Sequence, residues 1–198
     1  LETKTREQSF VTFIESSKPK TISSVAAKPV QRMATGIREF DRVLGGGIVP
    51  GSLILLSGDP GIGKSTILLD VAMRFSQKNI KTLYVSGEES ARQIKLRAER
   101  LHVDTENLQL LTVSDAEAIC DTITNTEPDI VIIDSIQTMS ISGVTSGSGS
   151  VPQVRECTNL FMRTEQDFRP RALIKFECRN ATGYQGNVKE LARDVNRW

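Results

Sequence analysis

The run 58–65, GDPGIGKS, constrains this chain more than any other stretch. It matches G-x-x-x-x-G-K-[ST], the pattern of a phosphate-binding loop, or P-loop. An apolar run at 53–56 precedes it and predicts a buried strand, while the residues after it predict a helix with an inward face. That face is formed by Ile67, Leu68, Val71, Ala72 and Phe75. Because the loop stands where a strand turns into a helix, the motif has the context that it requires.

Each part of the loop has an expected role. Its glycines let the backbone curl so that N–H groups point at a phosphate, and the following helix adds its positive N-terminal end. Lys64 is expected to neutralise the β- and γ-phosphate oxygens, and the Ser65 hydroxyl to bind Mg²⁺. An ordinary glycine-rich turn is the alternative, which the strand, the helix and the Lys-Ser-Thr ending disfavour. The predicted nucleotide-binding residues are Gly58, Asp59, Pro60, Gly61, Ile62, Gly63, Lys64, Ser65 and Thr66.

A second buried strand, predicted at 130–134, ends in a carboxylate. Its four aliphatic residues do not alternate with polar ones, which is typical of a parallel sheet covered by helices on both faces. An apolar strand that ends in Asp downstream of a P-loop is the usual Walker B pattern, with the carboxylate holding Mg²⁺ through water. We therefore predict an ATPase that uses ATP and Mg²⁺, with Ser65 and Asp134 as the metal-binding residues.

An acidic pair, Glu88 and Glu89, follows the strand predicted at 81–85. A carboxylate there can accept a proton from the water that attacks the γ-phosphate. Alternatively, the pair complements the N-terminal end of the next helix, and spacing alone favours neither interpretation. The residue after Asp134 is Ser135, where ATPases that carry their base beside the Walker B Asp have Glu. Glu88 is therefore the best candidate for the base, and Lys64 is the other predicted catalytic residue.

Strands alternate with helices along the chain, which predicts an α/β fold with a mainly parallel sheet flanked by helices. A further strand is predicted at 108–113, Thr35 is expected to cap a helix, and Ser114 with Glu117 matches a capping box. The Ser- and Gly-rich stretch at 140–150 is expected to be mobile. Three regions are expected: a linker or extended arm at 1–33, an ATPase core at 34–164, and a divergent tail at 165–198 with a strand and an amphipathic helix.

Composition excludes several other classes of protein. The net charge of +1 gives no global attraction to nucleic acid, so any such surface must be local. Three widely spaced cysteines argue against zinc and disulfides and suit the cytoplasm. No apolar run is long enough to span a membrane, and we do not expect a membrane as a partner. Because the chain begins with Leu1, we expect a fragment or a tagged chain.

Several motifs together resemble the bacterial RadA/Sms DNA repair ATPases. They are the P-loop and the runs TGI at 35–37, FDRVLGGG at 40–47, PGS at 50–52 and YVSGEES at 84–90. The runs at 93–98 and 134–138 extend the resemblance, which covers about 33–163. It implies a RecA-like P-loop NTPase core, ATP hydrolysis, hexameric rings and binding of single-stranded DNA. Because the residues at 142–150 include none able to read a base edge, we expect that binding to be sequence-independent.

The resemblance also implies roles for particular positions. Glu88 falls where RecA-class enzymes keep the glutamate that activates water. The loop at 142–150, followed by Arg155, lies where a RecA-like loop would bind DNA, although a disordered crossover is the alternative. RecA-like sheets also place a late strand between the P-loop strand and the Walker B strand. The run at 172–176 is the candidate for that strand, and Lys175 is unusual in a central one.

The chain departs from the family in three respects, and two other functions stay open. It has no four-cysteine zinc module before the core and no protease-like domain after it, and the residues from about 165 onward do not match. One rival is a KaiC-like signalling ATPase, whose turnover would not respond to DNA. The other is an interaction module that binds nucleotide without hydrolysing it, with tight ATP binding and no phosphate release.

Overall fold

A computed structural model describes residues 21–24, 31–100, 106–168 and 172–177. The chain divides into two units, Leu1–Val30 and Gln31–Trp198. In the first unit the described residues form a short 3-10 helix, η1 (Ile22–Ser24). The linker expected at 1–33 is described only in part, and the amphipathic helix expected near the C-terminus lies outside the described residues.

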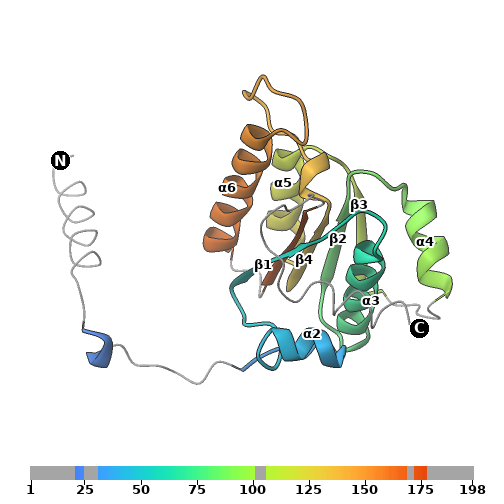
Figure 1. Ribbon diagram of the computed structural model, residues 1–198, viewed down its shortest axis with the longest axis vertical. Coiled ribbons are helices and arrows are strands. Elements are labelled where there is room, and N and C mark those ends of the chain that lie inside the picture. Colours follow the sequence, from blue (N-terminus) through green and yellow to red (C-terminus); the bar gives the residue numbers. More distant parts are fainter. Residues whose placement is uncertain (1–20, 25–30, 101–105, 169–171, 178–198) are drawn as a thin grey trace. The chain divides into compact units, whose positions relative to one another are not determined.

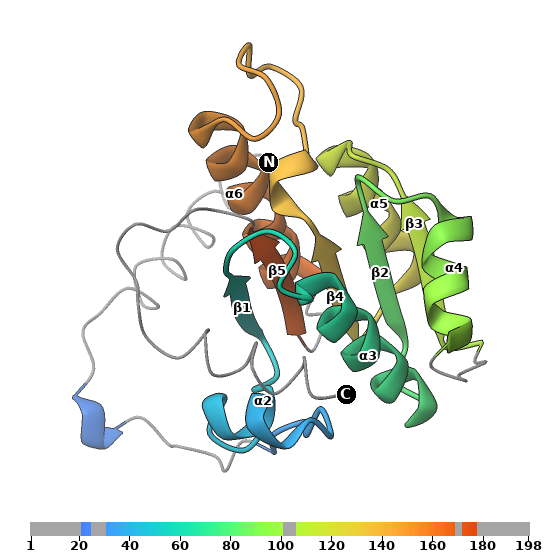
Figure 2. The same cartoon turned by 45° about the vertical axis from the view of Figure 1, so that its right-hand side comes forward.

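The second unit is built on a parallel sheet of five strands in the order β1-β5-β4-β2-β3 (Figures 1 and 2). The aliphatic run at 130–134 forms a strand buried along its whole length, because it places side chains on both faces of the sheet, where helices cover them. This arrangement confirms the predicted α/β fold. The strands are β1 (Ser52–Ser57), β2 (Thr82–Ser86), β3 (Leu108–Thr112), β4 (Ile130–Asp134) and β5 (Ala172–Glu177).

Two apolar clusters, one on each face of the sheet, form the core. Tyr84 and Ile132 belong to the cluster beneath α2, α3 and α4, whereas Val85 and Ile133 belong to the cluster beneath α5 and α6. Adjacent residues of one strand thus serve opposite layers, as the two-residue period of a strand requires. The helices are α2 (Arg38–Val43), α3 (Lys64–Gln77), α4 (Ala91–Arg100), α5 (Ala116–Thr126), η2 (Ile136–Thr138) and α6 (Val151–Phe168).

The last described strand, β5, lies between β1 and β4. It pairs in parallel with both, with Ile174 opposite Ile54 and Ile132. The late strand predicted at 172–176 is therefore confirmed in the position that was expected for it. The boundary expected at 164/165 falls inside α6, and β5 beyond it belongs to the same sheet as the P-loop strand.

Two predictions about helix starts are wrong. Helix α5 is capped by Asp115, not by Ser114, because the Asp115 carboxylate accepts hydrogen bonds from the backbone N–H groups of Glu117 and Ala118. Helix α2 begins after Ile37 rather than after Thr35. The Thr35 side chain instead accepts the Ile37 N–H at 3.1 Å. At α5 two adjacent polar residues stood near the helix start and local spacing did not decide between them, whereas at α2 the cap position is taken by Ile37, which makes no side-chain cap.

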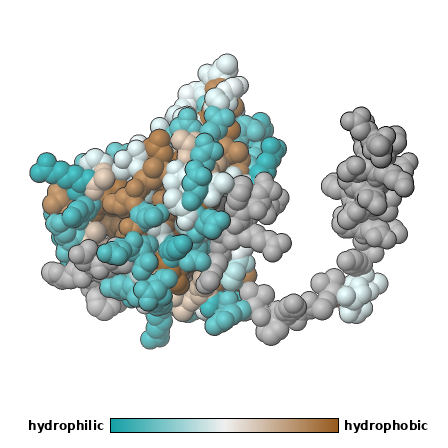
Figure 3. Space-filling model, turned by 180° about the vertical axis from the view of Figure 1, so that it is seen from behind, coloured by the Kyte–Doolittle hydropathy of each residue, from teal (hydrophilic) through white to brown (hydrophobic). Residues whose placement is uncertain are grey.

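Part of the described surface is apolar. Strand β1 lies at an edge of the sheet, and its Leu53 and Leu55 side chains are 38% and 58% exposed. Figure 3, which views the molecule from behind, shows apolar side chains gathered on part of the surface seen from that side. No helix within the described ranges is long and apolar enough to cross a membrane.

Candidate active site

The candidate site lies where the carboxyl ends of three strands meet. Strand β1 leads into the P-loop and α3, while Ser86 at the end of β2 stands opposite Asp134 at the end of β4. In open α/β sheets ligands bind at this edge. The fold therefore brings together the P-loop, the acidic pair and Asp134, which are far apart in sequence.

The P-loop has the backbone expected of a phosphate cradle. Gly61 and Gly63 adopt positive φ angles of 77° and 92°, which side-chain-bearing residues rarely adopt. Helix α3 begins at Lys64, so its N-terminal end faces the loop. The Lys64 side chain is only 5% exposed, and its ammonium donates to the carbonyl oxygen of Asp59. The Lys64 ammonium is therefore held within the loop.

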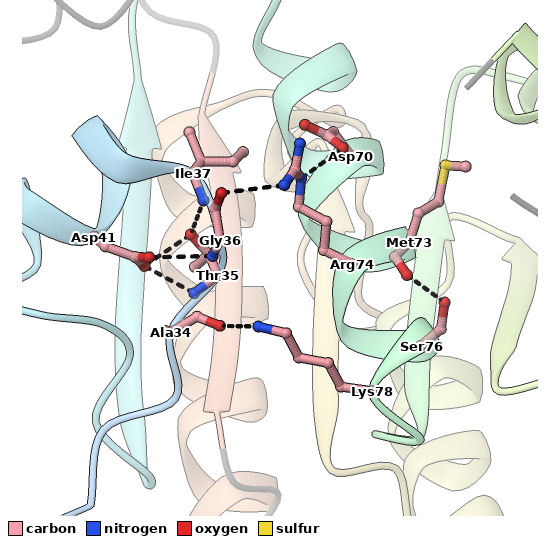
Figure 4. A network of polar contacts seen from close by, with 10 residues as sticks. All are labelled: Ala34, Thr35, Gly36, Ile37, Asp41, Asp70, Met73, Arg74, Ser76 and Lys78. Atoms are coloured by element: carbon pink, nitrogen blue, oxygen red, sulfur yellow. Dashed lines mark hydrogen bonds and ion pairs between the residues drawn. The ribbon is translucent and has the colours of Figure 1, made fainter. Parts of the chain in front are cut away.

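The segment before α2 is anchored to the P-loop helix α3 (Figure 4). Arg74 of α3 donates to the Gly36 carbonyl at 3.1 Å, and Lys78 donates to the Ala34 carbonyl at 2.7 Å. The Asp41 carboxylate accepts the Thr35 N–H and hydroxyl, each at 2.8 Å. These contacts give the TGI and FDRVLGGG runs a structural role: they fix the entry to the sheet against the helix that carries the P-loop.

Asp134 receives a hydrogen bond on each carboxylate oxygen. The Ser65 hydroxyl donates to Oδ1 at 3.1 Å, and the Tyr84 hydroxyl donates to Oδ2 at 2.6 Å. Burial raises the pKa of Tyr84, and the adjacent Asp134 carboxylate raises it further. The phenol therefore stays protonated and acts as a donor. Tyr84 was not among the predicted site residues, because nothing in a local sequence pattern signals a contact between two strands.

The donor set at this position fits Mg²⁺. Ser65 and Asp134 offer hard oxygen ligands close to each other, as their 3.1 Å hydrogen bond shows. No group of three or more His, Cys, Asp or Glu residues that could hold a metal occurs in the described part of the chain. Mg²⁺ needs no such cage, since it keeps several waters and is held by one or two protein groups together with substrate phosphates.

The two glutamates of the acidic pair have different surroundings. Glu89 forms a two-pronged ion pair with Arg97 of α4, with Oε1 3.0 Å from Nη1 and Oε2 2.9 Å from Nη2. Glu88 is exposed, and its Oε1 lies 3.5 Å from the Ser135 hydroxyl. Both oxygens of the Glu89 carboxylate are thus engaged by one guanidinium, whereas Glu88 has no such ion pair among the described residues. Arg97 was missed because contacts between a loop and a neighbouring helix have no fixed spacing.

Gly87 joins the acidic pair to the Walker B strand. Its N–H donates to the Asp134 carbonyl at 3.2 Å. A Cβ built on Gly87 would lie 2.8 Å from the Thr138 Cβ, which is closer than real contacts allow, and 3.2 Å from the Met139 Cε, which is tighter than most real contacts. The two strand ends can therefore approach this closely only with glycine at position 87.

We expect Gly87→Ala to lower the free energy of unfolding by about 1–3 kcal/mol, because the added methyl group overpacks the turn at Thr138. Chemical denaturation followed by circular dichroism measures this change. Gly147→Ala is the matched control, since a Cβ there meets nothing within 4 Å. Equal stability of the two variants would contradict the close packing described for Gly87.

The loop at 140–150 is held by more contacts than its composition predicts. Gln153 of α6 is 4% exposed, and its Oε1 accepts the Ile141 N–H at 3.0 Å. Its Nε2 donates to the carbonyls of Val144 and Ser146 at 3.1 and 2.9 Å. One buried amide thus makes three hydrogen bonds to the loop. No sequence pattern signals this role, because an isolated Gln near a helix start is normally a surface residue.

Comparisons with known proteins place this chain in a family. A family model described as "AAA domain" matches residues 19–167. The DNA repair protein RadA of Listeria monocytogenes is 53% identical over 149 residues, which cover 75% of this chain and 33% of that protein. RadA of Bacillus subtilis is 49% identical over 146 residues, covering 74% of this chain and 32% of that protein.

RadA of Escherichia coli is 48% identical over 140 residues, which cover 71% of this chain and 30% of that protein. The chain thus spans about a third of the length of the curated relatives it matches. The matches confirm the resemblance to the RadA ATPase core.

Proposed function

We propose that this chain, which belongs to the AAA domain family and matches RadA over three quarters of its length, is the ATP-hydrolysing core of a DNA repair motor. One observation carries the proposal: the Ser65 hydroxyl of the P-loop lies 3.1 Å from Asp134 Oδ1 of the Walker B strand. Together these groups form the metal end of a nucleoside triphosphate site. Phosphate release that requires Mg²⁺ and stops when EDTA is added tests the assignment.

In this mechanism the P-loop residues 58–66 bind the ATP phosphates through backbone N–H groups, and Lys64 neutralises charge on the β- and γ-phosphates. Mg²⁺, when bound by Ser65 and Asp134, supplies further charge neutralisation. Glu88 accepts a proton from the attacking water as that water bonds to the γ-phosphorus and the bond to the ADP oxygen breaks. Catalysis rests on positioning and on charge stabilisation.

The ion pair between Glu89 and Arg97 supports Glu88 as the base. Because Arg97 holds both carboxylate oxygens of Glu89 at 2.9 and 3.0 Å, those oxygens are not free to bind the attacking water. Glu88 lies instead beside Ser135, the residue that directly follows the Walker B aspartate. The description of the matching family as an AAA domain does not change the assignment of Glu88 as the base, since no glutamate follows Asp134 in this chain.

We extend the proposal to DNA. The relatives are named DNA repair proteins, and the loop at 142–150 with Arg155 follows the Walker B strand. The Arg155 side chain is 69% exposed and pairs with the neighbouring Glu156 at 3.2 Å, which is a weak surface pair. We propose that several copies assemble as a hexameric ring in the cytoplasm and track the phosphates of single-stranded DNA. Mass measurements with ATP and DNA test for the ring.

We expect Arg155→Ala to weaken single-stranded DNA binding and to lower the slope of log Kd against log salt by about 0.7 for each phosphate that the side chain no longer neutralises. Fluorescence anisotropy at two or more salt concentrations measures both quantities. Arg163→Ala is the matched control, because it removes the same charge from the same helix about 12 Å away. Tight, salt-insensitive or strongly sequence-selective binding by a monomer would refute this mode of DNA binding.

A further inference from the structure

Tyr84 was not among the predicted site residues, yet it hydrogen-bonds to the carboxylate of Asp134, a predicted metal-binding residue. The side chain is fully buried, and its hydroxyl donates to Asp134 Oδ2 at 2.6 Å. The other oxygen, Oδ1, accepts from Ser65 at 3.1 Å. The two oxygens of Asp134 therefore have separate partners, one in the sheet and one in the P-loop.

The sheet register explains why Tyr84 reaches this carboxylate. Tyr84 pairs with Ile132 and Ser86 pairs with Asp134 on adjacent parallel strands. Tyr84 is therefore a diagonal neighbour of Asp134 on the face that α3 covers, and a long aromatic side chain can span such a diagonal. Every residue of both strands is buried, which leaves the phenol little freedom to move.

We propose that Tyr84 is a positioning residue that restricts Asp134 to one oxygen toward the metal and so favours Mg²⁺ over Ca²⁺. This inference rests on the metal–nucleotide site proposed above and adds a determinant of its metal specificity. With Oδ2 bound by the phenol, the carboxylate cannot rotate without breaking a short buried hydrogen bond. Oδ1 is the oxygen that accepts from Ser65, the other residue that would hold the metal.

The chemistry of the two cations gives this restriction its consequence. Mg²⁺ demands near-ideal octahedral geometry and keeps several of its waters, so a single fixed oxygen suits it, including one that acts through a retained water as expected for Asp134. Ca²⁺ accepts six to eight oxygens and often takes both oxygens of one carboxylate. Removing the Tyr84 hydroxyl would free Oδ2, and the carboxylate could then offer both oxygens. The preference for Mg²⁺ should therefore narrow.

The test measures nucleotide affinity under three conditions, without following turnover. A fluorescent ATP analogue is titrated in EDTA, in Mg²⁺ and in Ca²⁺ against the original chain and Tyr84→Phe. We expect Tyr84→Phe to leave the nucleotide affinity in EDTA within about twofold of that of the original chain. The increase in affinity that Mg²⁺ gives over EDTA should fall about tenfold, the usual scale for a group that orients a metal ligand. The Ca²⁺-supported gain should not fall, so the ratio between the two cations shrinks.

Thr82→Val is the matched control. It removes a buried hydroxyl from the same strand, and that hydroxyl donates to the Ile80 carbonyl at 3.1 Å, not to Asp134. The ratio of Mg²⁺- to Ca²⁺-supported affinity should stay unchanged in this variant.

Three results would overturn the proposal: an equal loss of affinity by Tyr84→Phe in all three conditions, an unchanged cation ratio, or a Tyr84→Phe chain that is unfolded by circular dichroism when Thr82→Val is folded. The last would assign the hydroxyl to the fold instead of to the metal. Because binding alone is measured, a chain that fails to hydrolyse ATP would disprove the proposed activity and still give a result for Tyr84.

Discussion

Replacing Lys64 with alanine is expected to abolish tight ATP binding and turnover. Lys64 is 5% exposed at the start of α3, inside the loop that would enclose the phosphates. Its loss removes the main cation facing the β- and γ-phosphates, and a buried phosphate charge without a partner is strongly disfavoured. Isothermal titration with ATP and Mg²⁺, together with phosphate release, measures both effects.

Lys78→Ala is the control for this variant. Lys78 follows the same helix, and its ammonium contacts the Ala34 carbonyl at 2.7 Å, away from the P-loop. Removing it deletes the same charge and should leave nucleotide affinity nearly unchanged. Unchanged turnover in purified Lys64→Ala would contradict the assignment of the P-loop.

Replacing Glu88 with glutamine is expected to preserve nucleotide affinity and to lower hydrolysis by about a hundredfold or more. An amide has nearly the shape of the carboxylate but cannot accept the proton of the attacking water. Binding of a fluorescent ATP analogue and single-turnover phosphate release separate the two properties. A variant that binds ATP normally and releases phosphate slowly is the expected result.

Glu89→Gln is the matched variant within the acidic pair. It makes the same chemical change at the residue held by Arg97 at 2.9 Å, so we expect it to affect stability more than hydrolysis. Leaving Arg97 without its ionic partner costs free energy in a partly buried position. If Glu89→Gln slows hydrolysis more than Glu88→Gln does, the assignment of the base within the pair is wrong.

The sequence predicted the elements whose signals are local. The P-loop lies between β1 and α3, and the aliphatic run that ends in Asp134 forms a strand buried on both faces, because both patterns follow from short-range geometry. The position of β5 was also predicted, but only through the resemblance to RecA-like sheets, since one strand gives no sign of its neighbours.

Contacts between distant elements could not be predicted. Tyr84 of β2 contacts Asp134 of the neighbouring strand β4, and Arg97 of α4 contacts Glu89. Gln153 binds the loop that precedes its helix. Each depends on strand order, helix orientation or loop path, which a single sequence does not reveal. Gln153 shows this clearly: composition predicted a mobile loop, whereas its side chain makes three hydrogen bonds to that loop.

Phosphate release from ATP and Mg²⁺, measured with and without single-stranded DNA, tests the central claim most directly. The proposed motor should release phosphate in a Mg²⁺-dependent reaction that single-stranded DNA accelerates. Turnover indifferent to DNA would instead favour a signalling ATPase. Tight ATP binding with no phosphate release under either condition would contradict the claim and identify a module that binds nucleotide without hydrolysing it.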